Sequence, residues 1–226
     1  MVSLITEGRS TDERGRPFRR RRPLPWLILV TVFAVLGTVV WVGVLSTDDA
    51  STTAMACSDP SPSSDPAAPA PAPLGQRVDA SRLDDVEPAA LSATRVRVYN
   101  ANGQRGQAAH IASQLSDLGF ASAPDVQVGN DPVYVDQNME CSAQIRFGPS
   151  GAAAAASVQL AAPCAELIED TRPDDTVDLA LGTYFGEIAP NDDAEEVLRT
   201  LRAQQPGAEP APLDGDLLDA ARTARC

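Results

Sequence analysis

Residues 24–45 form an uninterrupted run of 22 residues without a charged side chain, LPWLILVTVFAVLGTVVWVGVL. As an α-helix, a run of this length extends roughly 33 Å, which suffices for the ~30 Å hydrocarbon core of a lipid bilayer. Trp26 and Trp41 lie near its two ends, where amphipathic aromatic side chains favour the headgroup region. The run therefore predicts a transmembrane helix at residues 23–45.

Residues 1–22 form a basic tail that holds seven Arg against three acidic residues. Basic residues beside a first apolar segment keep that side in the cytoplasm, so we expect a cytoplasmic tail and an extracytoplasmic C-terminal part. A cleaved signal peptide is the alternative, because residues 54–56 (Ala-Met-Ala) before Cys57 resemble a cleavage site or a lipoprotein motif. The apolar run is longer than the core of about 7–15 residues in a signal peptide, which favours a retained membrane anchor.

The rest of the chain is acidic, since the whole chain has a formal net charge of −13 despite its basic tail. A domain with this charge repels nucleic acid and anionic headgroups. We therefore expect no nucleic-acid partner for the main domain, and we expect the bacterial membrane to be contacted by the anchor.

Residues 46–73 are rich in Ser, Ala, Asp and Pro, with six prolines from Pro60 to Pro73. Such a segment has too little apolar surface to offset its ordering entropy, so we expect a linker followed by an extracytoplasmic domain at 74–226. All four cysteines follow the apolar run, and none forms a C-x-x-C motif. An even number of cysteines in an oxidising compartment predicts two disulfides, for which three pairings are possible.

The domain shows two kinds of hydrophobic period. Period-two alternation predicts strands, and spacings of three and four predict helices. Strands are expected at 95–99, 126–128, 142–147 and 177–182, and helices at 104–118, 150–162, 193–203 and 213–224. The order β-α-β-β-α-β predicts an α+β fold with a four-stranded antiparallel sheet, both helices on one face and additional C-terminal helices.

This layout favours one disulfide pairing. The second helix runs back along the third strand, so its end at Cys164 returns near the start of that strand at Cys141. We therefore expect a Cys141–Cys164 bond and, by elimination, a Cys57–Cys226 bond that connects the linker to the C-terminus.

No combination of residues in the chain predicts catalysis. A single histidine, His110, points away from the apolar face of its helix, which excludes a Ser-His-Asp site and a histidine-rich zinc site. The carboxylate pairs at 174–175 and 192–193 are adjacent in sequence and lack a calcium-loop pattern, so turn and helix-cap roles are expected. We accordingly expect no catalytic residues, no metal and no cofactor.

One turn is a candidate binding site. It follows the first strand of the domain, opens a helix and combines two glycines with an arginine, a setting that can hold an anion. Its candidate binding residues are Asn100, Asn102, Gly103, Arg105 and Gly106. The alternative is structural, with Gly103 forming the turn and Gly106 permitting close packing of helix on sheet.

The run VRVYNANG at 96–103, the GQAA that follows at 106–109 and the LGF at 118–120 resemble the LytR C-terminal domain. The segments GRPFRRRRP, QIRFGPSG, APCAEL and DDTVDLALGT, together with the four cysteines, are similar to a family of actinobacterial envelope integrity proteins. The resemblance implies a single-pass protein with its folded domain outside the membrane and a role in maintaining the cell envelope. It supplies no catalytic residues.

These observations lead to a non-enzymatic envelope protein that binds a cell-wall glycan, an envelope lipid or an envelope-assembly protein. One alternative is an adaptor that oligomerises other membrane proteins. The other is an enzyme that acts on wall polymers through its carboxylates.

Overall fold

A computed structural model describes residues 24–46, 55–204, 212–223 and 226. Within 24–46, side chains are described only from Leu24 to Thr38. The chain divides into two compact units, Met1–Asp49 and Ala50–Cys226. The first contains helix α1 (Leu24–Ser46). Within the described residues, no helix combines the length and the apolar character that a membrane crossing requires. The basic tail predicted at 1–22 lies outside the described residues.

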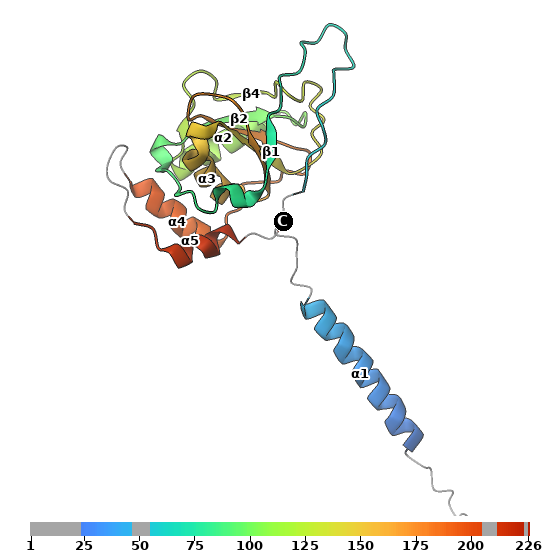
Figure 1. Cartoon of the computed structure of the whole chain (residues 1–226). Coiled ribbons are helices and arrows are strands. Elements are labelled where there is room, and N and C mark those ends of the chain that lie inside the picture. Colours follow the sequence, from blue (N-terminus) through green and yellow to red (C-terminus); the bar gives the residue numbers. More distant parts are fainter. Residues whose placement is uncertain (1–23, 47–54, 205–211, 224–225) are drawn as a thin grey trace, which may run out of the picture. The chain divides into compact units, whose positions relative to one another are not determined.

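The second unit is built on one seven-stranded sheet (Figure 1). Its strands are β1 (Gln76–Val78), β2 (Arg95–Asn100), β3 (Ala121–Ser122), β4 (Val128–Asn130), β5 (Ala143–Phe147), β6 (Ala165–Glu169) and β7 (Val177–Leu181). They lie in the order β1-β6-β5-β7-β2-β3, and β4 also pairs with β2.

The sheet is mixed, so the predicted antiparallel sheet is wrong. β2 pairs in parallel with β3, β4 and β7, and β5 pairs in parallel with β6. Only β1–β6 and β5–β7 are antiparallel. The physical reason is that β2 and β5 are each followed by a crossover helix. The helix returns the chain to the end of the sheet where the strand began, so the next strand runs parallel to it.

Three strands, β1, β3 and β6, were not expected from the sequence. β6 directly follows the helix α3 (Ala152–Ala161) and has Glu166 near its centre, so its apolar residues do not stand out as a run. The mixed α+β class is confirmed, but the β-α-β-β-α-β order lacked β6, the partner that makes β5-α3-β6 a parallel unit.

Helices pack on one face of the sheet. They are α2 (Gln107–Leu118), α3 (Ala152–Ala161), α4 (Asp192–Ala203) and α5 (Gly215–Arg222), with 3₁₀ turns at Ala80–Leu83, Leu91–Ala93 and Pro149–Gly151. Alternate strand residues such as Val98, Ile145 and Leu179 point into this core and are at most 1% exposed. α2 packs on β2, α3 packs on β5 and β7, and α4 contacts both helices. The N-cap of α4 is Asn191, whose side chain accepts from the backbone of Ala194, and not the expected Asp192.

The two ends of the segment 57–75 lie against the opposite face of the sheet, and its mostly exposed middle projects from the domain. In Figure 1 this segment belongs to the long teal loop that leads into β1. Cys57 is 6% exposed and forms a small apolar cluster with Val133, Tyr134, Met139 and neighbouring residues. The backbone N–H of Ala72 donates to the Pro132 carbonyl at 2.8 Å. We call residues 57–75 the strap.

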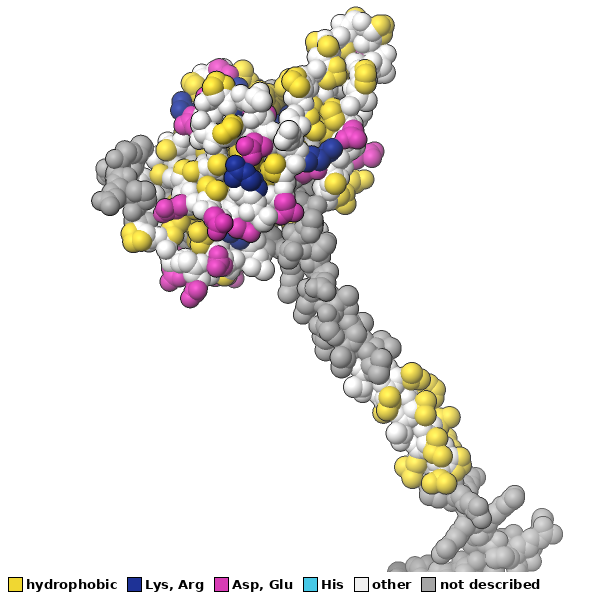
Figure 2. All heavy atoms as spheres, viewed as in Figure 1, with side chains coloured by type: hydrophobic (Ala, Val, Ile, Leu, Met, Phe, Trp, Pro, Cys, Tyr) yellow, Lys and Arg dark blue, Asp and Glu magenta, His cyan; other side chains and the backbone are white. Residues whose placement is uncertain are grey.

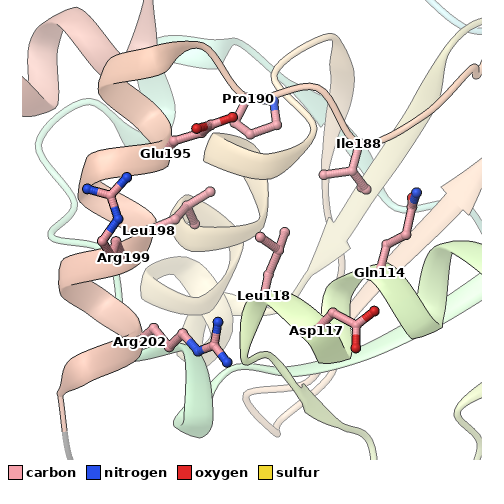
Figure 3. Close-up of a pocket in the computed structure, with 9 residues that line it drawn as sticks. All are labelled: Gln114, Asp117, Leu118, Ile188, Pro190, Glu195, Leu198, Arg199 and Arg202. Atoms are coloured by element: carbon pink, nitrogen blue, oxygen red, sulfur yellow. The ribbon is translucent and has the colours of Figure 1, made fainter.

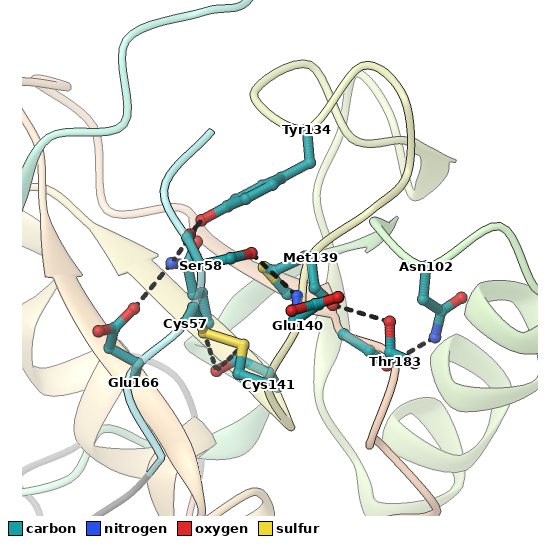
Figure 4. Close-up of a disulfide and its surroundings, with 12 residues drawn as sticks. Cys57, Ser58, Asn102, Tyr134, Met139, Glu140, Cys141, Glu166 and Thr183 are labelled. Atoms are coloured by element: carbon teal, nitrogen blue, oxygen red, sulfur yellow. Dashed lines mark hydrogen bonds between the residues drawn. A yellow bond between two sulfur atoms is a disulfide. The ribbon is translucent and has the colours of Figure 1, made fainter. Parts of the chain in front are cut away.

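Both predicted disulfides are wrong. The structure joins Cys57 to Cys141 and Cys164 to Cys226, with Cα–Cα distances of 4.7 and 5.4 Å. Cys141 does lie near the start of β5, but its side chain belongs to the apolar cluster under the strap, where it meets Cys57 (Figure 4). Cys164 instead lines a hollow with Thr223 near the end of α5. Cys141 and Cys164 therefore lie on different faces of the sheet.

Candidate functional site

The turn predicted to bind a ligand is held by its own asparagines. Asn100 accepts through Oδ1 from the backbone N–H of Asn102 at 3.1 Å and of Gly103 at 2.9 Å. Asn102 donates through Nδ2 to Gln107 and to the Gly182 carbonyl, both at 2.7 Å. These bonds occupy the side-chain groups that a ligand would need, so the structure assigns both asparagines to the turn.

The two glycines in this turn are required by backbone conformation. Gly103 has φ of 75° and Gly106 has φ of 81°, a left-handed region that favours glycine. A Cβ on Gly106 would meet no atom within 4 Å, so the expected close packing of helix on sheet at this position is wrong. Arg105 is exposed beside them. The five predicted residues thus lie together in one turn, and no contact among them indicates a ligand.

The acidic pairs also have local partners. Asp174 accepts from the backbone N–H and the hydroxyl of Thr176 at 3.0 and 2.5 Å, and these bonds hold the pKa of Asp174 below its ordinary value. Asp175 pairs with Arg95 at 2.5 Å. The pair at 192–193 lies in the first turn of α4, where carboxylates favour the helix dipole. Within the described part of the chain, no three acidic, His or Cys side chains gather into a metal-binding group.

A buried ionic cluster lies between the sheet and the strap. Arg146 on β5 has a 3% exposed side chain, and its Nη1 lies 2.8 Å from Oδ2 of Asp131, whose side chain is fully buried. Arg146 also donates to Gln144, and its guanidinium lies 5.7 Å from the ring centre of Tyr134. Gln144 donates in turn to Glu166 on β6 at 2.8 Å. This pairing offsets the cost of burying the charges.

The strap is bonded to this cluster. Tyr134 donates through its hydroxyl to the Ser58 carbonyl at 2.5 Å, and burial raises its pKa above 10.0 although Gln144 and Arg146 oppose this effect. Arg77 bridges the strap and the sheet through Asp59 at 2.7 Å and Glu166 at 3.0 Å. Figure 4 shows Ser58 and Cys57 between Tyr134 and Glu166. The N-terminal end of the strap therefore covers this cluster.

A second charged group continues along the same face at β2 and β7. Arg97 and Arg172 both bind Asp178, at 2.7 and 2.6 Å. Arg172 also binds Asp170 at 2.5 Å. Burial by itself would raise the pKa of Asp170, but its hydrogen bonds with Arg172 outweigh burial and lower the pKa below 3.8. These side chains neutralise one another, which is the behaviour of a structural network.

A groove of about 480 Å³ lies on the other side of the domain, between α2 and α4. We call it the α2–α4 groove (Figure 3). Its lining residues are Gln114, Asp117 and Leu118 from α2, Ile188 and Pro190 from the connection between β7 and α4, and Glu195, Leu198, Arg199 and Arg202 from α4. Volumes of roughly 300–1,000 Å³ are typical of small-molecule sites. The groove thus has the dimensions of a ligand site, as does the hollow of about 440 Å³ that Cys164 and Thr223 line.

The stem of Arg202 fixes one end of this groove. Its Cγ lies 3.0 Å from the position that a Cβ on Gly119 would occupy, and Gly119 ends α2 with φ of 109°. Sequence reasoning missed the groove because its walls come from helices that meet only in the folded chain. The detectable signal was the i, i+3 spacing of Arg199 and Arg202, which places two positive charges on one face of a helix.

Figure 2 shows acidic side chains over the visible face of the domain and fewer arginines between them. Most described arginines are paired with a carboxylate, as Arg82 is with Glu169 at 3.1 Å. Arg222 instead donates to backbone carbonyls of residues 83–86.

Comparison with known proteins identifies the family. Residues 93–185 match the family model LytR_C, described as LytR cell envelope-related transcriptional attenuator. The chain is 47% identical over 208 residues to the cell envelope integrity protein Cei of Mycobacterium tuberculosis, a match that covers 92% of each chain.

A crystal structure from Mycobacterium marinum, the soluble domain of a conserved hypothetical secreted protein, is 49% identical with a TM-score of 0.60. That comparison covers 68% of this chain and 99% of the other. The LytR_C match spans β2 to β7, so α4 and the groove wall that it supplies lie beyond it. From the extent and identity of these matches, the chain belongs to the family of the cell envelope integrity protein Cei.

Proposed function

We propose that this protein supports the integrity of the bacterial cell envelope without catalysing a reaction, as a membrane-anchored protein whose disulfide-bonded domain lies outside the cytoplasm. The observation that carries the proposal is the 47% identity to a cell envelope integrity protein over 92% of both chains. The domain would act by binding a component of the envelope, either a wall polymer, a lipid or an assembly protein.

The cysteines support a location outside the cytoplasm. Two disulfides close the domain, and such bonds persist in oxidising compartments outside the cytoplasm. The relative from Mycobacterium marinum is described as secreted. The basic tail at 1–22 supports the same orientation, because Arg-rich flanks stay on the cytoplasmic side.

The chemistry of α1 supports an anchor. Its described apolar side chains are exposed, with Trp26 at 72% and Phe33 at 65%. The hydroxyls of Thr31 and Thr38 donate to carbonyls one turn earlier, both at 2.8 Å. A polar group in a bilayer must find its partner within the protein, and these two do. An exposed apolar helix with internally bonded hydroxyls is suited to lipid.

Deleting the gene in its host tests the proposal. The deletion strain should take up a dye such as ethidium faster and should become more sensitive to detergent, and the full chain should restore the barrier. A chain in which residues 1–49 are replaced by a cleaved secretion signal is the control for anchoring and should restore it less well. Unchanged permeability of the deletion strain would exclude the envelope role.

A further inference from the structure

The α2–α4 groove is distinguished by arginines without partners. Among the arginines that the structure describes, only Arg105, Arg199 and Arg202 have neither a carboxylate nor a carbonyl as a partner. Two of these three line the groove from one face of α4. In a chain with net charge −13, two adjacent unpaired guanidiniums beside a groove indicate an anionic ligand.

The opposite wall has the reverse polarity. Gln114 on α2 has a buried Oε1 with no hydrogen-bond partner in the described structure. Asp117, one turn further along α2, adds an exposed carboxylate. A buried acceptor that lacks a donor costs free energy, which a ligand N–H would recover. This wall is therefore suited to N–H donors and a positive charge.

The floor between the two walls is aliphatic. Leu198 is 3% exposed, and Leu118 and Ile188 pack partly buried against the core. Figure 3 shows Leu118 and Leu198 in the middle of the groove, between the arginines and the Gln114 side. No lining residue is aromatic, so the groove offers small aliphatic contacts rather than a stacking platform for a sugar ring or base.

We propose that the α2–α4 groove binds a short peptide that has a free C-terminal carboxylate and small apolar side chains. The carboxylate lies between Arg199 and Arg202, a side chain covers Leu118, and a peptide N–H donates to Gln114 Oε1. A free amino terminus reaches Asp117. Glu195, one turn before Arg199, is the one acidic residue among the lining residues from α4. The two arginines outnumber it, so the α4 wall keeps a net positive charge.

This inference rests on the proposed function for its source of ligand, which is the peptide part of a wall polymer. Such a peptide combines the three properties that the groove matches, namely a carboxylate, amide donors and apolar side chains. A carboxylate held by two guanidiniums is recognised through charge-assisted hydrogen bonds, which are stronger than neutral ones.

Titration calorimetry on the full chain in detergent micelles tests this inference, with the tripeptide Ala-Ala-D-Ala as the probe. We expect the peptide to bind and its C-terminal amide to bind at least tenfold more weakly. R199Q/R202Q should lower the affinity at least tenfold, whereas Arg105→Gln, which removes the unpaired arginine outside the groove, should leave it unchanged. Asp117→Asn should weaken the free peptide more than its N-acetylated form.

Three results would overturn the inference. They are no measurable binding of the tripeptide, equal binding of acid and amide, and an affinity of R199Q/R202Q within twofold of the parent. Equal binding of all-L trialanine would assign the groove to protein C-termini and would overturn the wall-peptide source. If the deletion strain is permeable while no peptide binds, this inference fails alone; if the peptide binds and permeability is unchanged, only the proposed function fails.

Discussion

Removing Arg146 should destabilise the domain more than any substitution on its exposed surface. In Arg146→Met, the fully buried carboxylate of Asp131 loses the guanidinium 2.8 Å away, and Gln144 Oε1 loses the two hydrogen bonds that it accepts from Arg146. Breaking a buried ion pair on one side typically costs about 3–5 kcal/mol. Since a domain has about 5–15 kcal/mol of stability in total, this loss would be large.

A double variant isolates the ionic part of this loss. Asp131→Asn removes the charge but keeps a carbonyl at the position of Oδ1, which accepts from the backbone of Val133 and Tyr134 at 2.7 and 2.8 Å. We therefore expect R146M/D131N to be more stable than the sum of the single effects by about 2 kcal/mol, within the range of direct contacts.

Urea unfolding of residues 50–226, followed by circular dichroism with both disulfides intact, measures these values. Arg105→Gln is the matched control, because Arg105 is exposed and makes no ion pair, and it should change stability by less than about 0.5 kcal/mol. Additivity of the two single variants within about 0.5 kcal/mol would refute the reasoning, because it would mean that the two groups do not interact.

Two further predictions concern acid stability and a close backbone contact. Arg172 lowers the pKa of Asp170 below 3.8, so this carboxylate contributes stability that is complete above pH 3.8 and is lost as the pH falls through its lower folded value. In thermal melts, Asp170→Asn should therefore lower the melting temperature at pH 7 and make it fall less steeply below pH 4. A melting profile equal to that of the parent would argue against the pairing of Asp170 with Arg172. Gly182→Ala should severely destabilise the domain, because its Cβ would stand 2.2 Å from the Cys141 carbonyl, whereas Gly186→Ala, with no atom within 4 Å, should be tolerated. Equal melting temperatures for the two variants would contradict this contact.

Local patterns predicted the elements of the domain better than their arrangement. The alternation at 95–99 and 177–182 identified β2 and β7, and the helical spacing before Gly119 identified α2. β6 was missed because Glu166 is inside the strand, where its hydrogen bond from Gln144 allows it to be buried. Without β6 the parallel β5–β6 pairing was missed, and the parallel pairings of β2 with β3, β4 and β7 were not predicted either.

The disulfide pairing and the bonding of the candidate turn could not be predicted, because both depend on residues that are distant in sequence. Cys57 reaches Cys141 only because the N-terminal end of the strap lies against the second face, and the strap's contacts join residues more than 70 positions apart in sequence. In the candidate turn, Asn102 bonds to Gln107 and to the distant Gly182, and Asn100 accepts from the backbone of the turn itself. Long-range packing decides both outcomes, and it leaves no local period in the sequence.

The most direct test of the account is non-reducing peptide mapping of the chain taken from cells, with free thiols blocked at lysis. Arg77, Arg146 and Arg222 separate the successive cysteines, so trypsin releases the four on different peptides. We predict linked peptides that contain Cys57–Cys141 and Cys164–Cys226, with no blocked thiol. Free cysteines would contradict the extracytoplasmic location, and Cys57–Cys226 with Cys141–Cys164 would contradict the strap and the fold beneath it.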